Sequence, residues 1–428
     1  MIRLLAIGDV HLGRRPSRLP EPLTTSTGAR VPGPAMAWQR AIEHASEQAV
    51  DAVLLAGDVV EQADDFHEAF VDLRAGVERL AGRGIAVIGV SGNHDGEVLP
   101  RLAAEIPDFR LLGQGGVWET AEVVAASGQR VRIVGWSFPA PRVEFSPLAQ
   151  ALPARTDATT TIGLLHCDRD QPGSGHAPVR SHELRGAPVD AWLLGHIHQP
   201  DDLDRERPIG YLGSLTGLDP GEAGARGPWL VTVAGDGTLG VEHRPLAPLR
   251  WESLPISVDD LQAAEDVHGR ITRALDALHA DLTSQPYRPV AVGCRLLLTG
   301  RTHLRRALEQ TLTEADLTAT LYPQDGIDYF IHDWRLQVQP TIDLEATARG
   351  HDPVALLARR LLVLRGGDSA QRRRLIAAAR ERMTGVIERR PYADLAAPPP
   401  DDEAVAAHLE AAALRLLEEL DAQRRSGP

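Results

Sequence analysis

Short hydrophobic runs alternate with amphipathic stretches along the first two hundred residues of the chain. The runs are rich in Val, Ile and Leu and show no polar alternation, which is typical of strands covered on both faces. Between them, residues 35–49 and 64–84 place apolar side chains at the spacing of an amphipathic helix. This order predicts an α/β fold with a largely parallel sheet. The predicted strands cover residues 3–10, 51–59, 85–95, 131–137, 160–168 and 191–198.

The pattern changes near residue 251. Residues 209–246 still predict short strands with glycine-rich turns, and the chain from residue 350 onward is predicted to be helical, with a Pro-rich linker at 396–403. The stretch between these two regions predicts a small α+β domain made of a helix (259–283), a strand (289–300), a helix (302–314) and a strand (328–340). We therefore expect three parts, comprising residues 1–250, 251–345 and 350–428.

Composition narrows the class of protein. A chain of 428 residues has room for two or three domains, and its 43% hydrophobic and 24% charged residues are ordinary for a globular protein. No apolar run reaches the ~18 residues that a membrane span needs, and the first residues do not resemble a targeting segment. Only Cys167 and Cys294 are cysteines, so no disulfide framework is implied and we expect a cytoplasmic protein.

Charge is distributed unevenly along the chain. The formal net charge of −14 argues against a nucleic-acid partner, because phosphates attract a basic surface. Between Arg349 and Arg390, however, the sequence contains eleven arginines and only four acidic residues. This Arg-rich segment, most of it at 359–390, is interpreted either as a solvated helix face or as a contact with DNA phosphates or a partner protein.

Potential metal ligands follow several of the predicted strands. The carboxyl ends of parallel strands meet at one edge of a sheet, so side chains placed there converge. In extended turns residues i and i+2 point the same way, which allows each of two Asp/His or His/His pairs to bind one site. The candidates are Asp9 and His11 in GDVH, Asp58 in GDVV, Asn93 and His94 in GNHD, His166 in GLLH, and His196 and His198 in GHIH.

The types of donor point to a pair of ions. Carboxylate and imidazole ligands without cysteine suit Mn, Fe or Zn better than Ca, or Mg alone. Two aspartates, one asparagine and four of the histidines make seven side chains, which are too many for one tetrahedral ion but suit two ions that share one carboxylate, as in two-metal hydrolases. A glycine precedes each group of ligands (Gly8, Gly57, Gly92 and Gly195), and we expect these glycines to allow a sharp exit from the strand and space for the metals.

These motifs resemble a known family. GDVH, GDVVE, GNHD, a lone histidine after a strand and GHIH match, in order, the motifs of the calcineurin-like metallophosphoesterases. GNHD together with GHIH is similar to the phosphodiesterase and nuclease branch, and within it to the bacterial DNA-repair exonucleases of the SbcD and YhaO type. The resemblance is strong over residues 1–245. It implies a β-sandwich flanked by helices (αββα), with a small α+β cap domain and C-terminal helices.

The resemblance also implies roles for individual residues. His94 would be no ligand but would face the scissile phosphate, as general acid or as a stabiliser of the transition state, and Asp95 would orient it. Glu61 stands where the nuclease family commonly has Asp, and we expect that position to be structural. Metal 1 would be held by Asp9, His11, His198 and the bridging Asp58, and metal 2 by Asp58, Asn93, His166 and His196.

The implied function is hydrolysis of DNA phosphodiester bonds by two divalent ions, with Mn favoured over Fe, Mg or Zn. The resemblance further implies a coiled-coil ATPase of the SbcC type as partner, bound through the C-terminal helices, and a possible homodimer. One helix face there carries Val405, Leu409, Ala412, Leu416 and Leu420, which would pack either within its own domain or on that partner. Alternatives are a small-molecule or nucleotide phosphodiesterase and a non-catalytic scaffold for the ATPase.

Overall fold

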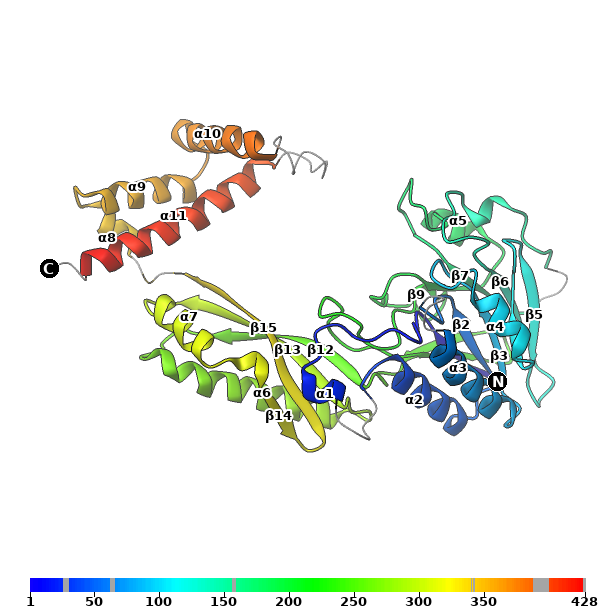
Figure 1. Ribbon diagram of the computed structural model, residues 1–428. Coiled ribbons are helices and arrows are strands. Elements are labelled where there is room, and N and C mark those ends of the chain that lie inside the picture. Colours follow the sequence, from blue (N-terminus) through cyan, green and yellow to red (C-terminus); the bar gives the residue numbers. More distant parts are fainter. Residues whose placement is uncertain are drawn as a thin grey trace. The chain divides into compact units, whose positions relative to one another are not determined.

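The computed structural model describes residues 1–25, 31–61, 66–155, 159–339, 341, 343–387 and 400–425 (Figure 1). The chain forms two compact units. The first contains Met1–Leu254, Arg273–Leu296 and Asp316–Trp334, and the second contains Pro255–Thr272, Leu297–Ala315 and Arg335–Pro428. The three-part division expected from the sequence stays a prediction. Part of its Pro-rich linker, residues 396–399, lies outside the described residues.

A six-stranded sheet begins the first unit. Its strands lie in the order β11-β10-β1-β2-β3-β4, and β1 to β4 run parallel to one another, whereas β10 and β11 join antiparallel. The buried runs IRLLAI, AVLLA and AVIGV form its centre, as the unbroken hydrophobic pattern predicted. The strands are β1 (Ile2–Ile7), β2 (Ala52–Ala56), β3 (Ala86–Val90), β4 (Phe109–Leu111), β10 (Trp229–Val233) and β11 (Leu239–His243).

A second sheet of five strands belongs to the same unit. Its order is β5-β6-β7-β8-β9, with β6 to β9 parallel and β5 antiparallel at one edge. The edge strands β4 and β5 lie where the hydrophobic pattern predicted none. The strands of this sheet are β5 (Glu119–Val124), β6 (Arg130–Trp136), β7 (Thr161–His166), β8 (Ala191–Gly195) and β9 (Ile209–Tyr211).

The two sheets pack face to face. Leu4 and Leu54 of the first sheet share a buried cluster with Ile133, Leu164 and Leu193 of the second. Helices α2 and α3 cover the outer face of the six-stranded sheet, and the cluster around Trp136 and Trp192 covers that of the five-stranded sheet. The predicted αββα sandwich is therefore confirmed. Its helices are α2 (Pro34–Glu47), α3 (Phe66–Ala81), α4 (Leu99–Glu105), η2 (Pro147–Ala149) and α5 (Ser181–Gly186), preceded by α1 (Glu21–Thr25).

A third sheet with its own helices follows, in agreement with the predicted α+β region. Its four strands lie in the order β12-β13-β15-β14. The predicted helix at 259–283 begins later, at Val267, after a short 3-10 turn. The elements are β12 (Leu249–Ser257), η3 (Ala264–Asp266), α6 (Val267–Ser284), β13 (Ala291–Arg301), α7 (Arg305–Glu314), η4 (Leu317–Ala319), β14 (Leu321–Gln324) and β15 (Ile327–Gln339).

The C-terminal region is helical, as predicted. Its helices are α8 (Leu344–Ala348), α9 (Pro353–Arg365), α10 (Ala370–Ile387) and α11 (Asp402–Arg425). They bury two small cores between them, one around Leu361 and Leu417 and the other around Ile376 and Val405. The expected stripe on α11 is only partly used for internal packing: Val405 is buried and Leu409 and Leu420 pack against these cores, whereas Ala412 and Leu416 are exposed. Among the described helices, none is long and apolar enough to span a membrane.

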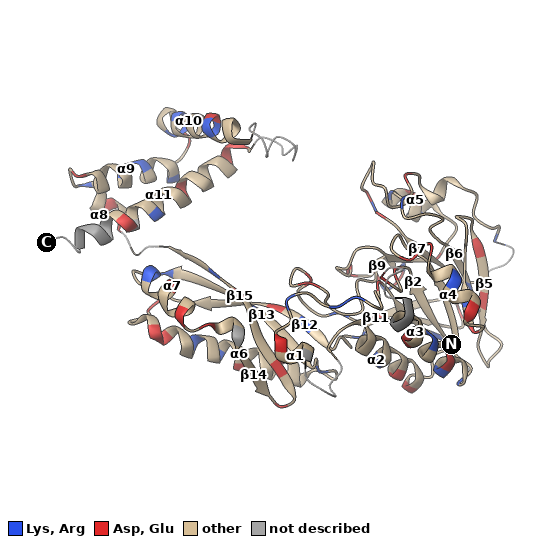
Figure 2. Ribbon diagram, in the orientation of Figure 1, with Lys and Arg blue, Asp and Glu red and all other residues tan. Residues whose placement is uncertain are grey.

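Several arginines of the Arg-rich segment are engaged within this helical region, whose charges Figure 2 shows. Arg365 lies 2.7 Å from Glu410, Arg373 2.5 Å from Asp368, and Arg380 pairs with Asp402. These pairs neutralise part of the positive charge that the sequence places there. Residues 388–390 of the segment lie outside the described residues.

Candidate metal centre

The predicted ligands come from the carboxyl ends of five strands of the two packed sheets. Asp9 and His11 follow β1, Asp58 follows β2, Asn93 follows β3, His166 ends β7, and His196 and His198 follow β8. The chain leaves several of these strands in a left-handed conformation, with φ of 53° at His11, 47° at Asp58 and 102° at His196. These sharp exits direct the side chains that follow toward one region.

The glycines before the ligands allow the loops to approach closely. A Cβ on Gly57, where φ is 95°, would lie 2.6 Å from Nδ1 of His166. A Cβ on Gly92 would lie 2.2 Å from Oδ1 of Asp58. Neighbouring side chains of the site thus occupy the space beside Gly57 and Gly92, so a side chain at either position would collide with a ligand.

One group of ligand atoms comprises Asp9, His11 and His198, whose donor atoms all lie within 4.8 Å of one another. Nε2 of His11 is 3.0 Å from Nε2 of His198. The Oδ2 atom of Asp9 is buried and has no hydrogen-bond partner among the described residues. A buried carboxylate oxygen of this kind is costly unless a cation or donor faces it, so this group fits a metal ion.

A second group comprises Asp58, His166 and His196, again with donor atoms within 4.8 Å of one another. Oδ1 of Asn93 lies 3.0 Å from Nε2 of His166 and 3.0 Å from Nδ1 of His196. Oδ2 of Asp58 is 3.3 Å from Nε2 of His166 and 3.9 Å from Nε2 of His11. Asp58 therefore lies between the two groups, where a bridging carboxylate would have to be.

Hydrogen bonds on the outer side fix which nitrogen of each histidine faces inward. Nδ1–H of His11 donates to Glu61 (2.6 Å), that of His166 to the carbonyl of Ala56 (3.1 Å), and that of His198 to Glu222 (2.8 Å). His196 is reversed, since its Nε2 lies 3.1 Å from Oδ1 of Asp168. In the neutral rings the lone pairs then point into the two groups, as metal-binding histidines require.

The electrostatics favour positive charge at the second group. Burial alone would raise the pKa of Asp58, but the neighbouring His166 outweighs it and holds the pKa below its ordinary value. Burial would lower the pKa of His166, and the Asp58 carboxylate outweighs that effect and raises it. Both shifts show that the buried carboxylate stabilises a cation beside it, and a divalent ion would supply that charge.

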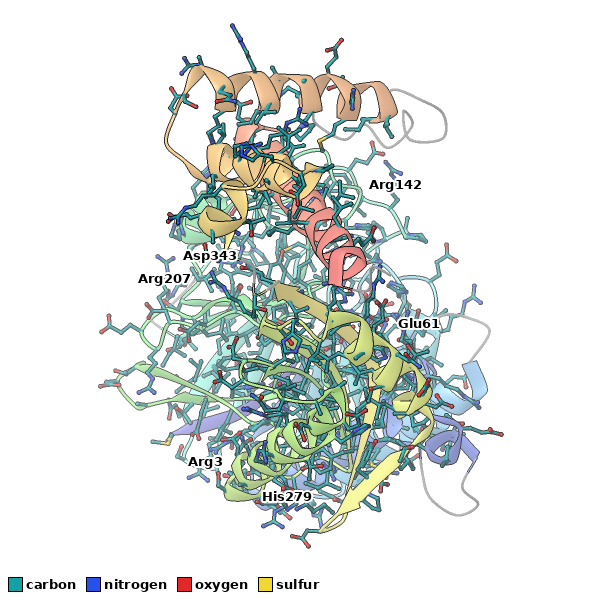
Figure 3. The ribbon with its side chains drawn as sticks, turned by 90° about the vertical axis from the view of Figure 1, so that its left-hand side faces the viewer. Arg3, Glu61, Arg142, Arg207, His279 and Asp343 are labelled. Carbon is teal, nitrogen blue, oxygen red and sulfur yellow. The ribbon has the colours of Figure 1, made fainter. Side chains whose placement is uncertain are left out.

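His94 is placed beside the two groups, as expected, but its partner is not Asp95. Nδ1 of His94 lies 3.4 Å from Oε1 of Glu61, and this carboxylate raises the pKa of His94 above its ordinary value. Glu61 is labelled in Figure 3. Because Oε2 of Glu61 also accepts from His11, one carboxylate serves both rings. The sequence analysis expected only a structural position for Glu61, and the structure places its carboxylate between two rings of the site.

Asp95 has a different position from the one predicted. It is fully buried, and its carboxylate accepts hydrogen bonds from the backbone N–H groups of Gly92 (2.7 Å) and Val59 (2.7 Å). Those bonds tie the loop after β3 to the loop after β2. Asp95 thus positions the two loops and does not orient His94, because its side chain points toward the backbone beneath the site.

Three further residues lie beside the ligands and are not among the candidates named from the sequence. Asp168 follows His166 by two residues, a spacing that could have indicated it. His176 lies close to Asp168 and His196, and its ring centroid is 4.8 Å from that of His196. Glu222 carries no local signal, because only the fold brings it to His198.

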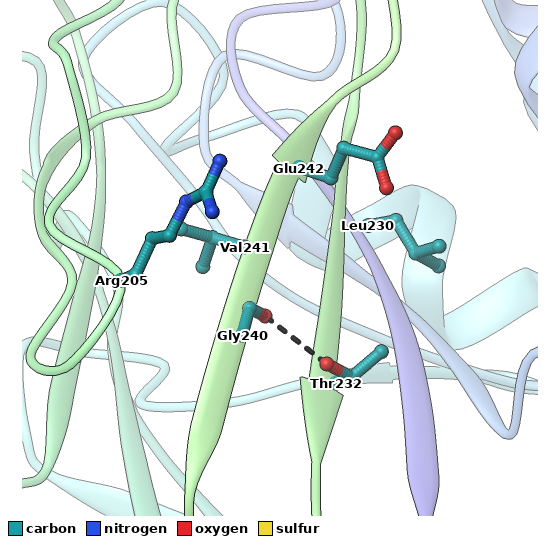
Figure 4. Close-up of a pocket in the computed structure, with 6 residues that line it drawn as sticks. All are labelled: Arg205, Leu230, Thr232, Gly240, Val241 and Glu242. Atoms are coloured by element: carbon teal, nitrogen blue, oxygen red, sulfur yellow. Dashed lines mark hydrogen bonds between the residues drawn. The ribbon is translucent and has the colours of Figure 1, made fainter.

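One cleft of the described residues lies away from this centre and has a different lining. Figure 4 shows this cleft of about 260 Å³ over β10 and β11, where the Thr232 hydroxyl lies 3.4 Å from the carbonyl of Gly240. Its lining holds none of the predicted site residues. The residues that line it are Arg205, Leu230, Thr232, Gly240, Val241 and Glu242.

Comparisons with known proteins agree with this geometry. Residues 2–200 match the family model described as calcineurin-like phosphoesterase, and residues 251–338 match that of the middle domain of metallophosphoesterase YhaO. An uncharacterized metallophosphoesterase YhaO of Bacillus subtilis (strain 168) is 28% identical over 344 residues, which cover 79% of this chain and 80% of the relative.

A second relative is the DNA double-strand break repair protein Mre11 of Aeropyrum pernix. It is 29% identical over 259 residues, covering 56% of this chain and 60% of the relative. The crystal structure of the calcineurin-like phosphoesterase YfkN from Bacillus subtilis covers 65% of this chain and 98% of its own, at 12% identity and a TM-score of 0.37, which is too low to support an argument. Residues 2–200, in which the converging motifs lie, are thus similar to the calcineurin-like phosphoesterases, and the donor groups there could hold metal ions.

Proposed function

We propose that this chain is a two-metal phosphodiesterase that cleaves DNA. The observation that carries the proposal is the position of Asp58, whose Oδ2 lies within 3.9 Å of an inward-facing nitrogen of each histidine group. One carboxylate between two groups of donors is the arrangement that two neighbouring cations require. The site residues fit two ions better than one, because their donors fall into two groups and seven side chains exceed what one tetrahedral ion takes.

Each ion would be held by four side chains. When bound, the two divalent cations would activate a water molecule and neutralise charge on the phosphate oxygens. Manganese suits the mixture of carboxylate, amide and imidazole donors. The first ion would contact Asp9, His11, His198 and Asp58, and the second would contact Asp58, Asn93, His166 and His196.

His94 supplies the proton in this proposal. Cleavage of a phosphodiester expels an alkoxide, which is a strong base and leaves faster when it is protonated. The ring of His94 is 30% exposed, so one edge can reach substrate while Glu61 lies behind its Nδ1. Glu61 therefore keeps the ring aimed, and the backbone N–H of His94 donates to Asp58 (3.0 Å), which fixes the distance between the proton donor and the ions.

DNA is proposed as the substrate because of the relatives. The Aeropyrum pernix protein of 29% identity is named as a DNA double-strand break repair protein. The match to the YhaO middle domain at residues 251–338 extends the likeness beyond the phosphoesterase domain, and a small-molecule diesterase has no evident need of such an addition. An exonuclease in DNA repair is the specific form of this proposal.

A coiled-coil ATPase partner completes the proposal. Leu356 of α9 and Leu416 of α11 are each 48% exposed, although most of the apolar side chains around them pack inside the helical region. These leucines would contribute to binding the ATPase. Replacing both with Ser should leave the nuclease activity of the isolated chain intact and weaken co-purification with the ATPase.

The test of function compares two substrates. The purified full chain with Mn²⁺ should degrade linear duplex DNA, and the same protein in which His94 is replaced by Gln should not. A chromogenic phosphodiester serves as the reference for chemistry without a polymer. Turnover of the small ester alone would reject DNA as the substrate, and failure to turn over either compound would reject the phosphodiesterase itself.

A further inference from the structure

His176 lies beside the second group of ligands, on the segment that follows β7. Its ring is tilted by 44° against the ring of His196, with 4.8 Å between the centroids. Its Nδ1 lies 3.6 Å from Oδ2 of Asp168, and its side chain is 41% exposed. The imidazole therefore rests on a proposed metal ligand on one side and is open on the other.

Backbone hydrogen bonds hold the segment in place. The N–H of Asp168 donates to the carbonyl of His176 (2.8 Å), and the N–H of Ala177 donates to the carbonyl of Val143 (2.8 Å). The N–H of His176 itself donates to the hydroxyl of Ser174 (3.0 Å). Since these bonds use only the backbone of His176, its side chain can be replaced without removing the supports of the segment.

His176 and His94 have similar surroundings. His94 makes an edge contact with His11 at 5.1 Å and has Glu61 at 3.4 Å, and is 30% exposed. Each of the two exposed rings thus lies against a ligand of a different ion and has a carboxylate at its Nδ1. The proposed function employs only His94.

A third metal ion at this place is less consistent with the contacts. Asp168 Oδ1 already lies 3.1 Å from Nε2 of His196, and Asp168 Oδ2 accepts from the hydroxyl of Ser174. Asp168 would have to give up those donors to bind an ion, and His196 would have to bind two ions at once. The carboxylate instead accepts from Ser174 and lies beside the imidazoles of His196 and His176.

We propose that His176 donates a hydrogen bond to a non-bridging phosphate oxygen of the substrate on the side of the second ion. The inference rests on the proposed function and adds a substrate contact that determines binding. An imidazole with a carboxylate at one nitrogen is a strong donor toward an anion at the other. Because a phosphate oxygen is present both before and during the reaction, the contact should act mainly on KM.

The test uses the Mn²⁺-loaded full chain and the variants His176→Ala and His176→Gln. The matched control is His182→Ala, which removes an exposed histidine from the same segment between β7 and β8. His176→Ala should raise KM for a phosphodiester about tenfold and change kcat by less than about threefold. It should weaken the binding of inorganic phosphate, measured by calorimetry, by a similar factor. His176→Gln, which keeps an N–H donor, should recover part of both losses, and the control should resemble the unmodified chain.

Several outcomes would overturn the inference. Loss of manganese from His176→Ala, measured by elemental analysis, would make the residue a ligand. An unchanged KM together with unchanged phosphate binding would leave it no role toward substrate. The phosphate measurement does not depend on turnover, so weakened phosphate binding in a chain that hydrolyses no diester would reject the proposed function and not the contact.

Discussion

Replacing Glu61 with Gln separates the two contacts that this side chain makes. The amide oxygen of Gln can still accept from Nδ1–H of His11, which preserves the orientation of that ligand. The negative charge near Nδ1 of His94, however, is lost. We therefore expect normal metal content together with a weakened proton donor.

The size of the effect follows from the geometry. Opposite unit charges 3.4 Å apart interact by about 5 kcal/mol at an effective dielectric constant of about 20. The side chains of Glu61 and His94 are 17% and 30% exposed, so water screens much of that attraction. We expect a loss of about 1.4–2.8 kcal/mol in the transition state, or about 10- to 100-fold in kcat.

The assay compares leaving groups. An alkyl leaving group, such as a nucleoside hydroxyl, needs protonation, whereas an acidic phenol leaves as its anion. Glu61→Gln should therefore slow the alkyl diester by the full factor and a nitrophenyl diester only slightly. Glu61→Ala should in addition weaken metal binding, because His11 loses its acceptor. Equal loss on both esters, or loss of manganese from the Gln variant, would refute the reasoning.

Three further predictions concern two other residues of the site and one partly buried histidine of β11. His94→Gln should reduce cleavage of an alkyl diester about 10²- to 10⁴-fold while metal content, measured by elemental analysis, stays unchanged. Asp168→Ala should weaken Mn²⁺ binding at the second site about 10- to 100-fold, which a metal titration would resolve as two unequal steps. Burial lowers the pKa of His243 to about 4, so the unfolded chain binds the extra proton between about pH 6.5 and pH 4, and stability should fall by up to about 3 kcal/mol as the pH drops through that window. Denaturant titrations should show this loss reduced in His243→Gln; an equal loss in both proteins would contradict it.

The strands and the ligands were predictable because they depend on local pattern. Runs such as AVLLA are buried on both faces. Such a strand ends at or before the first polar residue that follows its apolar run, because that residue would be buried in the core if the strand continued. Parallel neighbours bring those ends to one edge, so Asp9 and Asp58 had to lie near each other once β1 and β2 paired. The edge strands β4 and β5 were missed because one of them is short and the other alternates polar residues on an exposed face.

The acceptors behind the histidines were not predictable in the same way. Glu222 is 24 residues from His198 in the chain, and it reaches that ring through a loop that also brings it to the hydroxyl of Ser214 (3.0 Å). No local spacing encodes such a contact. The spacing of apolar residues correctly predicted a helix at α11. It misplaced the centre of the buried face of that helix, since Leu417 is buried and Leu416 is half exposed.

The exchange of roles between Asp95 and Glu61 has a structural cause. In the loop after β3 the side chains of consecutive residues diverge, so the carboxylate directly after His94 turns down toward the N–H groups of Gly92 and Val59. Fixing these two loops against each other sets the separation of Asn93 and Asp58. The partner of His94 must then come from across the site, and Glu61, three residues after Asp58, is held there by its bond to His11. The adjacency of His94 and Asp95 in the sequence was therefore misleading. The buried carboxylate of Asp95 is stabilised by the nearest backbone donors, whereas the partly exposed imidazole of His94 is paired with a carboxylate from the loop opposite it.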